Sequence, residues 1–246
     1  MTDPTQALSF GTAAADYDRY RPRYPQAALR WALDGIDAPA RLVDLAAGTG
    51  ILARGLLALG HRVTAVEPDP GMRAQLTSVD TEVRALAGSA ETMPLPGGFA
   101  DAVLTGQAYH WFDRPRAHAE IARVLRPGGV FAPLWNLRDD SCAWVAELSR
   151  IAEIGDTVEH LRQSVTDFGD SFTAPEWAEF THASTLTPDE LLGLVRTRSH
   201  YLTATPARRA EVDHQVRALL HTHPDLATQE TITLPYTTLV ARARRT

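Results

Sequence analysis

Lysine is absent from this 246-residue chain, because all 24 of its basic residues are arginine. Schiff-base catalysis and phosphate binding by a P-loop lysine are therefore excluded. Cysteine is nearly absent, and the single Cys142 can neither close an internal disulfide nor share a metal with a second thiol. This count excludes a cystine scaffold and a cysteine zinc cluster, and it indicates a reduced, intracellular setting.

Long apolar runs are also missing, since no window approaches the roughly eighteen consecutive apolar residues of a membrane span. The first residues lack the basic and apolar regions of a signal peptide, so we expect a cytoplasmic protein with no membrane partner. The 30 acidic residues outnumber the 24 basic ones, for a formal net charge of −6, which disfavours nucleic acid as a partner. The histidines show no metal spacing, so we expect no metal.

Short apolar runs alternate with helical periodicity from Arg41 to Arg138. Strands are predicted at 41–46, 62–66, 83–87, 100–105 and 129–135, and helices at 51–59, 71–78 and 115–125. This alternation predicts an α/β fold with a parallel, Rossmann-like sheet that helices cover on both faces. Pro127-Gly128-Gly129 is expected to end the third helix before the next strand.

The residues after Arg138 predict two final strands with helices inserted around them. The strands are expected at 177–186 and 230–242, and Pro235 is expected to confine the second one to an edge or a bulge. Helices are predicted at 142–156, from Pro188 to Arg196 behind a capping box, and from Pro206 to about His223. We expect one domain, with an arm at 1–40, a core at 41–138 and the final strands and inserted helices at 139–246.

Residues 43–53, VDLAAGTGILA, predict a strand, a glycine turn and the start of a helix. Gly48, Gly50 and Ala53 have the spacing of a dinucleotide site, which leaves a nicotinamide-dependent oxidoreductase open as an alternative. Asp44, at the carboxyl end of the strand, would repel a pyrophosphate on the helix N-terminus. The same carboxylate suits a cofactor with an amino group and a sulfonium, and S-adenosylmethionine has both.

Two later strand ends carry residues that fit the same cofactor. Glu67 follows the second strand, where an acidic side chain accepts hydrogen bonds from both ribose hydroxyls. The turn at 88–96 follows the third strand and suits the edge of an adenine, through backbone N–H groups and the hydroxyl of Ser89.

Four segments together resemble the class I S-adenosylmethionine-dependent methyltransferases of the type 11 family. They are VDLAAGTG at 43–50, VEP at 66–68, GSAE at 88–91 and LRPGG at 125–129. The resemblance covers most of residues 8–138. The stretch from Phe10 to Pro25, the run QAYHWFD at 107–113 and the ending LPYTTL at 234–239 are similar to the trans-aconitate methyltransferase-like branch.

This resemblance implies methyl transfer from S-adenosylmethionine, with S-adenosylhomocysteine as product. The expected partner is a small-molecule acceptor methylated on O or N, including a carboxylate or a secondary metabolite, and a macromolecular acceptor is the alternative. The protein is expected to be a monomer or a homodimer. Ser89 departs from the family pattern, because relatives carry Asp at this position and a hydroxyl accepts from the adenine amino group more weakly.

The strand ends and the resemblance together define the expected site. The cofactor-binding residues are expected to be Tyr17, Arg21, Asp44, Ala46, Gly48, Gly50, Glu67, Pro68, Met72, Ser89, Ala90, Glu91 and Gln107. The substrate-binding residues are expected to be Tyr20, Tyr24, Trp111, Asn136, Arg138, Arg198 and Tyr201.

Two features of this expected site have alternative interpretations. His110 is the catalytic candidate, as a base that takes the proton of the acceptor or as a residue that only shapes the pocket. The resemblance implies that 17–24 forms a helical lid over the cofactor, and the alternative is a solvated arm.

Overall fold

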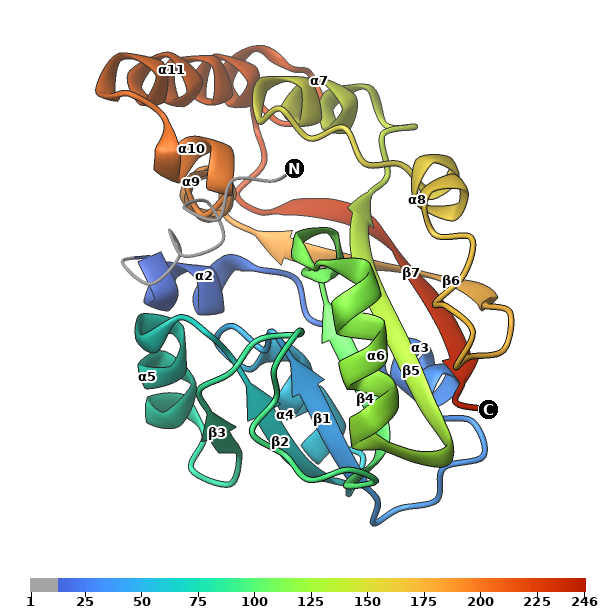
Figure 1. The fold of residues 1–246 in the computed structure, drawn as a ribbon. Coiled ribbons are helices and arrows are strands. Elements are labelled where there is room, and N and C mark those ends of the chain that lie inside the picture. The colour runs from blue at the N-terminus through green and yellow to red at the C-terminus, as the bar shows by residue number, and fades with distance from the viewer. Residues whose placement is uncertain (1–12) are drawn as a thin grey trace.

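A seven-stranded sheet in the order β3-β2-β1-β4-β5-β7-β6 forms the centre of the computed structural model, which describes residues 13–246 (Figure 1). The first five strands are parallel: β1 (Arg41–Leu45), β2 (Arg62–Val66), β3 (Arg84–Leu86), β4 (Ala100–Gly106) and β5 (Leu125–Arg138). The last two, β6 (Glu176–Leu186) and β7 (Ile232–Arg244), run antiparallel to their neighbours. The predicted fold class is therefore confirmed. Phe10, one of the residues that carry the resemblance, lies outside the described residues.

Helices cover both faces of the sheet, because the central strands are apolar on both sides. One face packs against α6 (Arg114–Val124) and α8 (Val158–Ser164), and the other packs against α3 (Gln26–Ala32), α4 (Ile51–Leu57) and α5 (Pro70–Val79). The side chains of Asp69 and Asp113 cap α5 and α6, each ahead of a proline in the first turn.

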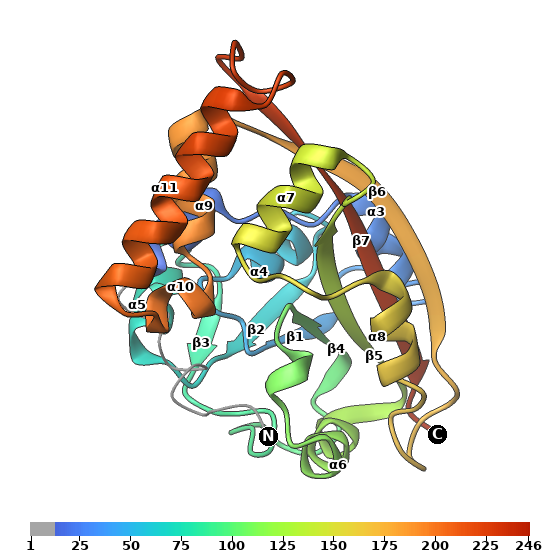
Figure 2. The same ribbon diagram turned by 90° about the horizontal axis from the view of Figure 1, so that it is seen from above.

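A third helical group lies beyond the carboxyl ends of the parallel strands (Figures 1 and 2). It contains α7 (Ala143–Ile151), α9 (Pro188–Arg196), α10 (Ser199–Thr203) and α11 (Pro206–Thr222), and α7, α9 and α11 share a core cluster with residues of β6 and β7. Thr187 and Glu190 form the predicted capping box of α9. Helix α2 (Ala14–Tyr20) lies between this group and the sheet.

The expected break at 127–129 is wrong, because β5 begins at Leu125, directly after α6. The Pro-Gly-Gly segment continues the strand: Gly128 N donates to Arg245 O at 3.0 Å, and Arg245 N donates to Gly129 O at 2.8 Å. A register shift against β4 between Ala100 and Ala102 accommodates the additional residues.

The expected edge position of the last strand is also wrong, because β7 lies between β5 and β6. Pro235 is tolerated there because it faces the end of β5, where its carbonyl accepts from Asp139 N at 3.1 Å. The missing N–H of proline therefore falls where the β5 ladder ends.

Three short helices, α3, α8 and α10, occupy segments in which no helix was predicted. Each has five to seven residues. Isolated helices of this length are unstable in water, so tertiary packing stabilises them and local periodicity does not reveal them. Within residues 13–246, no helix has the length and apolarity needed to cross a membrane.

Candidate active site

The site lies where the strand order reverses, between β1 and β4. From β1 the chain first adds β2 and β3 on one side and then β4 and β5 on the other, which opens a crevice at the carboxyl ends of these strands. Ala46 directly follows β1 and Gln107 directly follows β4, with φ angles of 55° and 60°. Left-handed backbone at two non-glycine residues is strained, and here it falls on both sides of the crevice.

The glycine turn after β1 has the conformation that only glycine adopts easily. Gly48 and Gly50 have φ angles of 55° and 82°. A Cβ atom on Gly50 would lie 2.9 Å from Leu76 Cγ, so helix α5 packs directly on the turn. The backbone of the turn therefore stays open toward the crevice.

Asp44, near the carboxyl end of β1, is fully buried. Its Oδ2 accepts from Ala53 N at 2.9 Å, in the first turn of α4, whereas its Oδ1 has no hydrogen-bond partner among residues 13–246. Burial, with a smaller contribution from the nearby Glu67, raises the pKa of Asp44 to about 8, although the hydrogen bond from Ala53 and the charge of Arg54 oppose this shift. The side chain thus caps a helix with one oxygen and keeps the other for a cationic or hydrogen-donating group.

Glu67 follows β2 and is almost fully buried beside the same turn. Its two carboxylate oxygens accept from Gly48 N and Asp69 N, each at 2.8 Å. Burial raises the pKa of Glu67, and these two hydrogen bonds oppose the shift. The residue therefore ties the ends of β1 and β2 together, and each of its oxygens keeps a second lone pair.

The turn after β3 is tight and closed on itself. Ser89 N donates to Thr92 O at 3.1 Å and Thr92 N donates to Ser89 O at 3.2 Å. A Cβ atom on Gly88 would lie 2.7 Å from Pro94 Cδ, so glycine is required at the entrance of the turn. Glu91 accepts from Asp113 N at 3.0 Å and joins this turn to the start of α6.

A cavity of about 570 Å³ lies over these strand ends. Of the expected cofactor residues, the following line it: Tyr17, Arg21, Ala46, Gly48, Glu67, Pro68, Met72, Ser89, Ala90, Glu91 and Gln107. Asp44 lines a smaller adjoining pocket of about 40 Å³, which shares Tyr17, Gly48 and Gln107 with the cavity. Gly50 lies in the turn itself and is in neither wall. The structure thus brings the predicted cofactor residues together.

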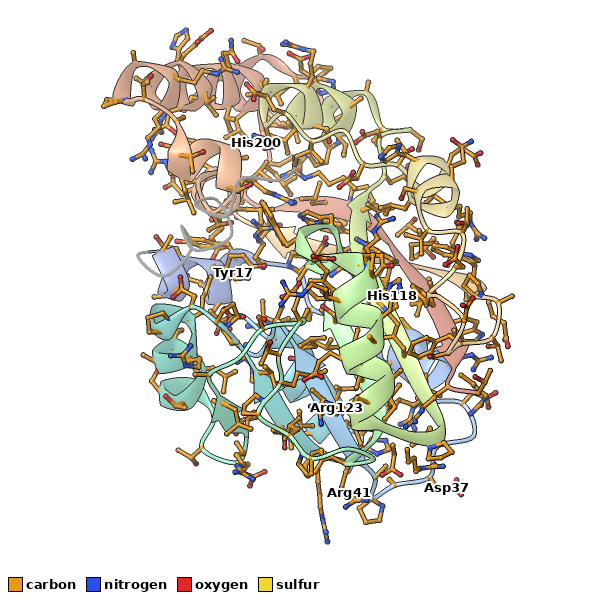
Figure 3. The ribbon with its side chains drawn as sticks, in the orientation of Figure 1. Tyr17, Asp37, Arg41, His118, Arg123 and His200 are labelled. Atoms are coloured by element: carbon orange, nitrogen blue, oxygen red, sulfur yellow. The ribbon has the colours of Figure 1, made fainter. Side chains whose placement is uncertain are left out.

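Helix α2 is tied to both sides of the crevice. Asp18 Oδ1 accepts from Thr49 Oγ1 at 2.9 Å and forms an ion pair with Arg54, which fixes the helix to the glycine turn. Arg21 Nε and Nη2 donate to Thr197 Oγ1 and Thr197 O at 3.0 and 2.9 Å, which fixes the end of the helix to α9. Figure 3 shows the labelled Tyr17 between the sheet and the helical group that holds His200.

His110 lies in the short 3-10 helix Tyr109–Trp111 and lines the cavity. Its ring is accessible from the cavity, while the surrounding protein lowers its pKa by burial and Asp156 opposes this shift. The imidazole is therefore neutral near pH 7, the state in which a nitrogen lone pair can accept a proton.

The expected substrate residues divide among several environments. Trp111 and Arg198 line the large cavity, and Tyr24 and Asn136 line the small pocket. Asn136 also holds the N-terminal segment, because its Nδ2 donates to Pro22 O and Arg23 O at 3.4 Å.

Three other expected substrate residues lie outside both cavities. Tyr20 packs on Gly193 of α9, where a Cβ atom would lie 2.5 Å from its ring. Tyr201 donates to Asp213 at 3.0 Å and lines a separate pocket among the helices. Arg138 is buried at the end of β5.

One segment of the cavity wall, the loop Glu153-Ile154-Gly155-Asp156 after α7, was not predicted. Its glycine and two acids are a weak loop signal in the sequence. The pair Ser199-His200, which begins α10, lies among the inserted helices that were expected near the acceptor. Among residues 13–246, no three His, Cys, Asp or Glu side chains gather as a metal site.

Comparisons with known proteins agree with this geometry. Residues 43–132 match a family described as "Methyltransferase domain". An uncharacterized methyltransferase of Mycobacterium tuberculosis is 42% identical over 237 residues, which cover 96% of each chain. A malonyl-[acyl-carrier protein] O-methyltransferase of Pectobacterium atrosepticum is 34% identical over 128 residues, about half of each chain.

The fold is also similar to that of a solved methyltransferase structure. A solved structure from Anaeromyxobacter dehalogenans, assigned as a type II methyltransferase, is 27% identical and superposes with a TM-score of 0.64 over 92% of this chain and 98% of that one. These findings support the predicted methyltransferase over the nicotinamide-dependent alternative. Because the chain is 42% identical to a methyltransferase over nearly its whole length, it belongs to the class I methyltransferase family and is a methyltransferase.

Proposed function

We propose that the chain transfers a methyl group from S-adenosylmethionine to a small-molecule acceptor, and that donor and acceptor share the cavity of about 570 Å³. The observation that carries this proposal is the pair of buried carboxylates, Asp44 and Glu67, at neighbouring strand ends beside a glycine turn. A cavity of this volume is within the usual range for small-molecule sites.

The residues present fit this donor. The unpartnered Oδ1 of Asp44 suits an ammonium group, and the remaining lone pairs of Glu67 suit the two ribose hydroxyls. The turn at 89–91, with Pro68 and Met72, provides the wall for an adenine. When bound, S-adenosylmethionine supplies a methyl group activated by its sulfonium.

The chain itself positions the reactants and excludes water. Helix α2 is proposed as a lid, because Asp18 and Arg21 tie it to both sides of the crevice and its residues Tyr17 and Arg21 line the cavity. The guanidinium carbon of Arg21 also lies 4.5 Å from the centre of the Tyr17 ring, and this contact and the two hydrogen bonds to Thr197 hold the group in the cavity wall. Alignment of this kind supplies much of the rate of a displacement reaction.

The acceptor atom is proposed to be oxygen or nitrogen. The neutral imidazole of His110 can accept a proton from a hydroxyl or an amine, whereas an ionised carboxylate needs no base. The similarity to a malonyl-[acyl-carrier protein] O-methyltransferase and to the trans-aconitate methyltransferase-like branch favours oxygen.

Calorimetric titration with S-adenosylhomocysteine, and with NAD as the comparison, tests the cofactor. We expect S-adenosylhomocysteine to bind and NAD not to bind, and we expect weaker S-adenosylhomocysteine binding in Glu67→Gln but not in Glu82→Gln, an exposed control. Incubating the protein and methyl-labelled cofactor with separate small-molecule and protein fractions of a cell extract tests the acceptor class. Label in the protein fraction only would refute a small-molecule acceptor.

A further inference from the structure

Three arginines from distant parts of the chain converge at one end of the site. Arg21 ends helix α2, Arg138 ends strand β5, and Arg198 lies between α9 and α10. Arg21 and Arg198 line both the large cavity and the small pocket, so they share one wall of the site. Burial lowers the pKa of Arg198 well below its ordinary value, and the charges of Arg21 and Arg138 also lower it.

Two of these arginines lack acceptors. Among residues 13–246, none of the three guanidinium nitrogens of Arg138 has a hydrogen-bond partner, nor does Nε of Arg198, although the hydroxyl of Tyr236 lies beside Arg138. That hydroxyl has no partner within the same residues either. Within the described part of the chain, none of the three arginines forms an ion pair with a carboxylate within 4 Å.

Arg242 shows what a buried structural arginine looks like in the same protein. It is as buried as Arg138, and it donates to Trp31 O at 2.8 Å and to Glu176 at 2.6 Å. Within residues 13–246, the opposing carboxylate for Arg138 is the exposed Asp140, which already accepts from Ser149. Buried charges without partners destabilise a fold, so an anionic ligand is the natural complement of this end of the site.

The methionine carboxylate of the cofactor does not account for all three charges. It is expected near Arg21, which is also tied to Thr197 and lies against Tyr17. Arg198 lines the large cavity, and the buried Arg138 adds its positive charge to the surroundings of Arg198. One carboxylate binds one arginine fork, so a second anion remains to be placed.

On the basis of the proposed function, we propose that the methyl acceptor carries a carboxylate or a similarly compact oxyanion, which Arg198 binds and Arg138 attracts. The positive end of the cavity selects anionic acceptors and orients them, and the cofactor carboxylate remains with Arg21.

Malonate is a suitable probe, with its uncharged diamide, malonamide, at equal ionic strength. Calorimetry on protein saturated with S-adenosylhomocysteine measures malonate binding to the wild type, Arg198→Gln and Arg138→Met. Arg196→Gln is the matched control, because Arg196 is exposed on α9 and paired with Asp213. We expect malonate but not malonamide to bind, about tenfold or more weaker binding in both site variants, and unchanged binding in the control.

Thermal unfolding separates an effect of the substitutions on the fold from an effect on binding. Because Arg138→Met removes an unpaired buried charge, we expect this variant to unfold at a temperature equal to or above that of the wild type. Weaker malonate binding then cannot be ascribed to loss of the fold. No malonate binding to the loaded wild type, or equal binding in Arg198→Gln, would refute the inference. Binding of malonate only when S-adenosylhomocysteine is absent would assign the arginines to the cofactor carboxylate and also refute it. Failure of S-adenosylhomocysteine to bind would instead refute the proposed function.

Discussion

Replacement of Asp44 by asparagine removes a buried ionisable group but keeps the shape and the acceptor for Ala53 N. In the folded chain the pKa of Asp44 rises to about 8 from an ordinary value near 3.8. Between these values the folded protein holds a proton that the unfolded chain has released, so the free energy of unfolding falls as the pH rises through this window. At about 1.4 kcal/mol per pH unit, the loss reaches at most about 6 kcal/mol at pH 8.

Urea unfolding from pH 4 to pH 9 measures this effect. We expect Asp44→Asn to match the wild type near pH 4, to become progressively more stable than it as the pH rises, and to level off above pH 8. Asp37→Asn, an exposed control, is expected to follow the wild type throughout. Parallel curves for Asp44→Asn and the wild type would refute the buried, protonated carboxylate.

Cofactor binding provides a second test of the same group. A cationic cofactor favours the ionised form of Asp44, so binding near pH 7 is expected to release close to one proton. Calorimetry in buffers of different ionisation enthalpy counts this proton. Asp44→Asn is expected to bind S-adenosylmethionine more weakly and to release no proton, and proton release unchanged in this variant would contradict the assignment.

Three further substitutions test other parts of the site. Glu67→Ala is expected to weaken S-adenosylhomocysteine binding about tenfold or more in calorimetry, because two charge-assisted hydrogen bonds are lost, and unchanged affinity would remove the ribose assignment. His110→Ala is expected to lower turnover more than cofactor affinity and to abolish an acidic limb in the pH–rate profile, whereas equal damage to both would indicate packing. Gly193→Ala places a methyl group against the ring of Tyr20, so faster hydrogen exchange in α2 and weaker cofactor binding are expected without loss of the fold, and unchanged exchange would contradict the role of this contact in holding the lid.

Local patterns were sufficient for most of the sheet. Strand β2 was predicted with its observed bounds, and the capping box at Thr187 correctly began helix α9. Two local signals gave wrong predictions because they depend on strand pairing. Pro235 indicated an edge strand and the Pro-Gly-Gly segment indicated a break, but both lie inside the sheet. In each case a distant backbone group supplies the pairing that a local rule does not include.

The sequence by itself determined the α/β fold, the glycine turn and the acids Asp44 and Glu67 at the strand ends, because these depend on short-range periodicity and on where parallel strands end. Only the tertiary structure decided that Arg198 and Arg21 line the same cavity, and that Arg138 lacks an acceptor among the described residues. It also decided that Asp44 is buried deeply enough for its pKa to rise to about 8. Ionisation and pairing depend on which side chains the fold brings together and how deeply it buries them, and separation along the chain does not encode this.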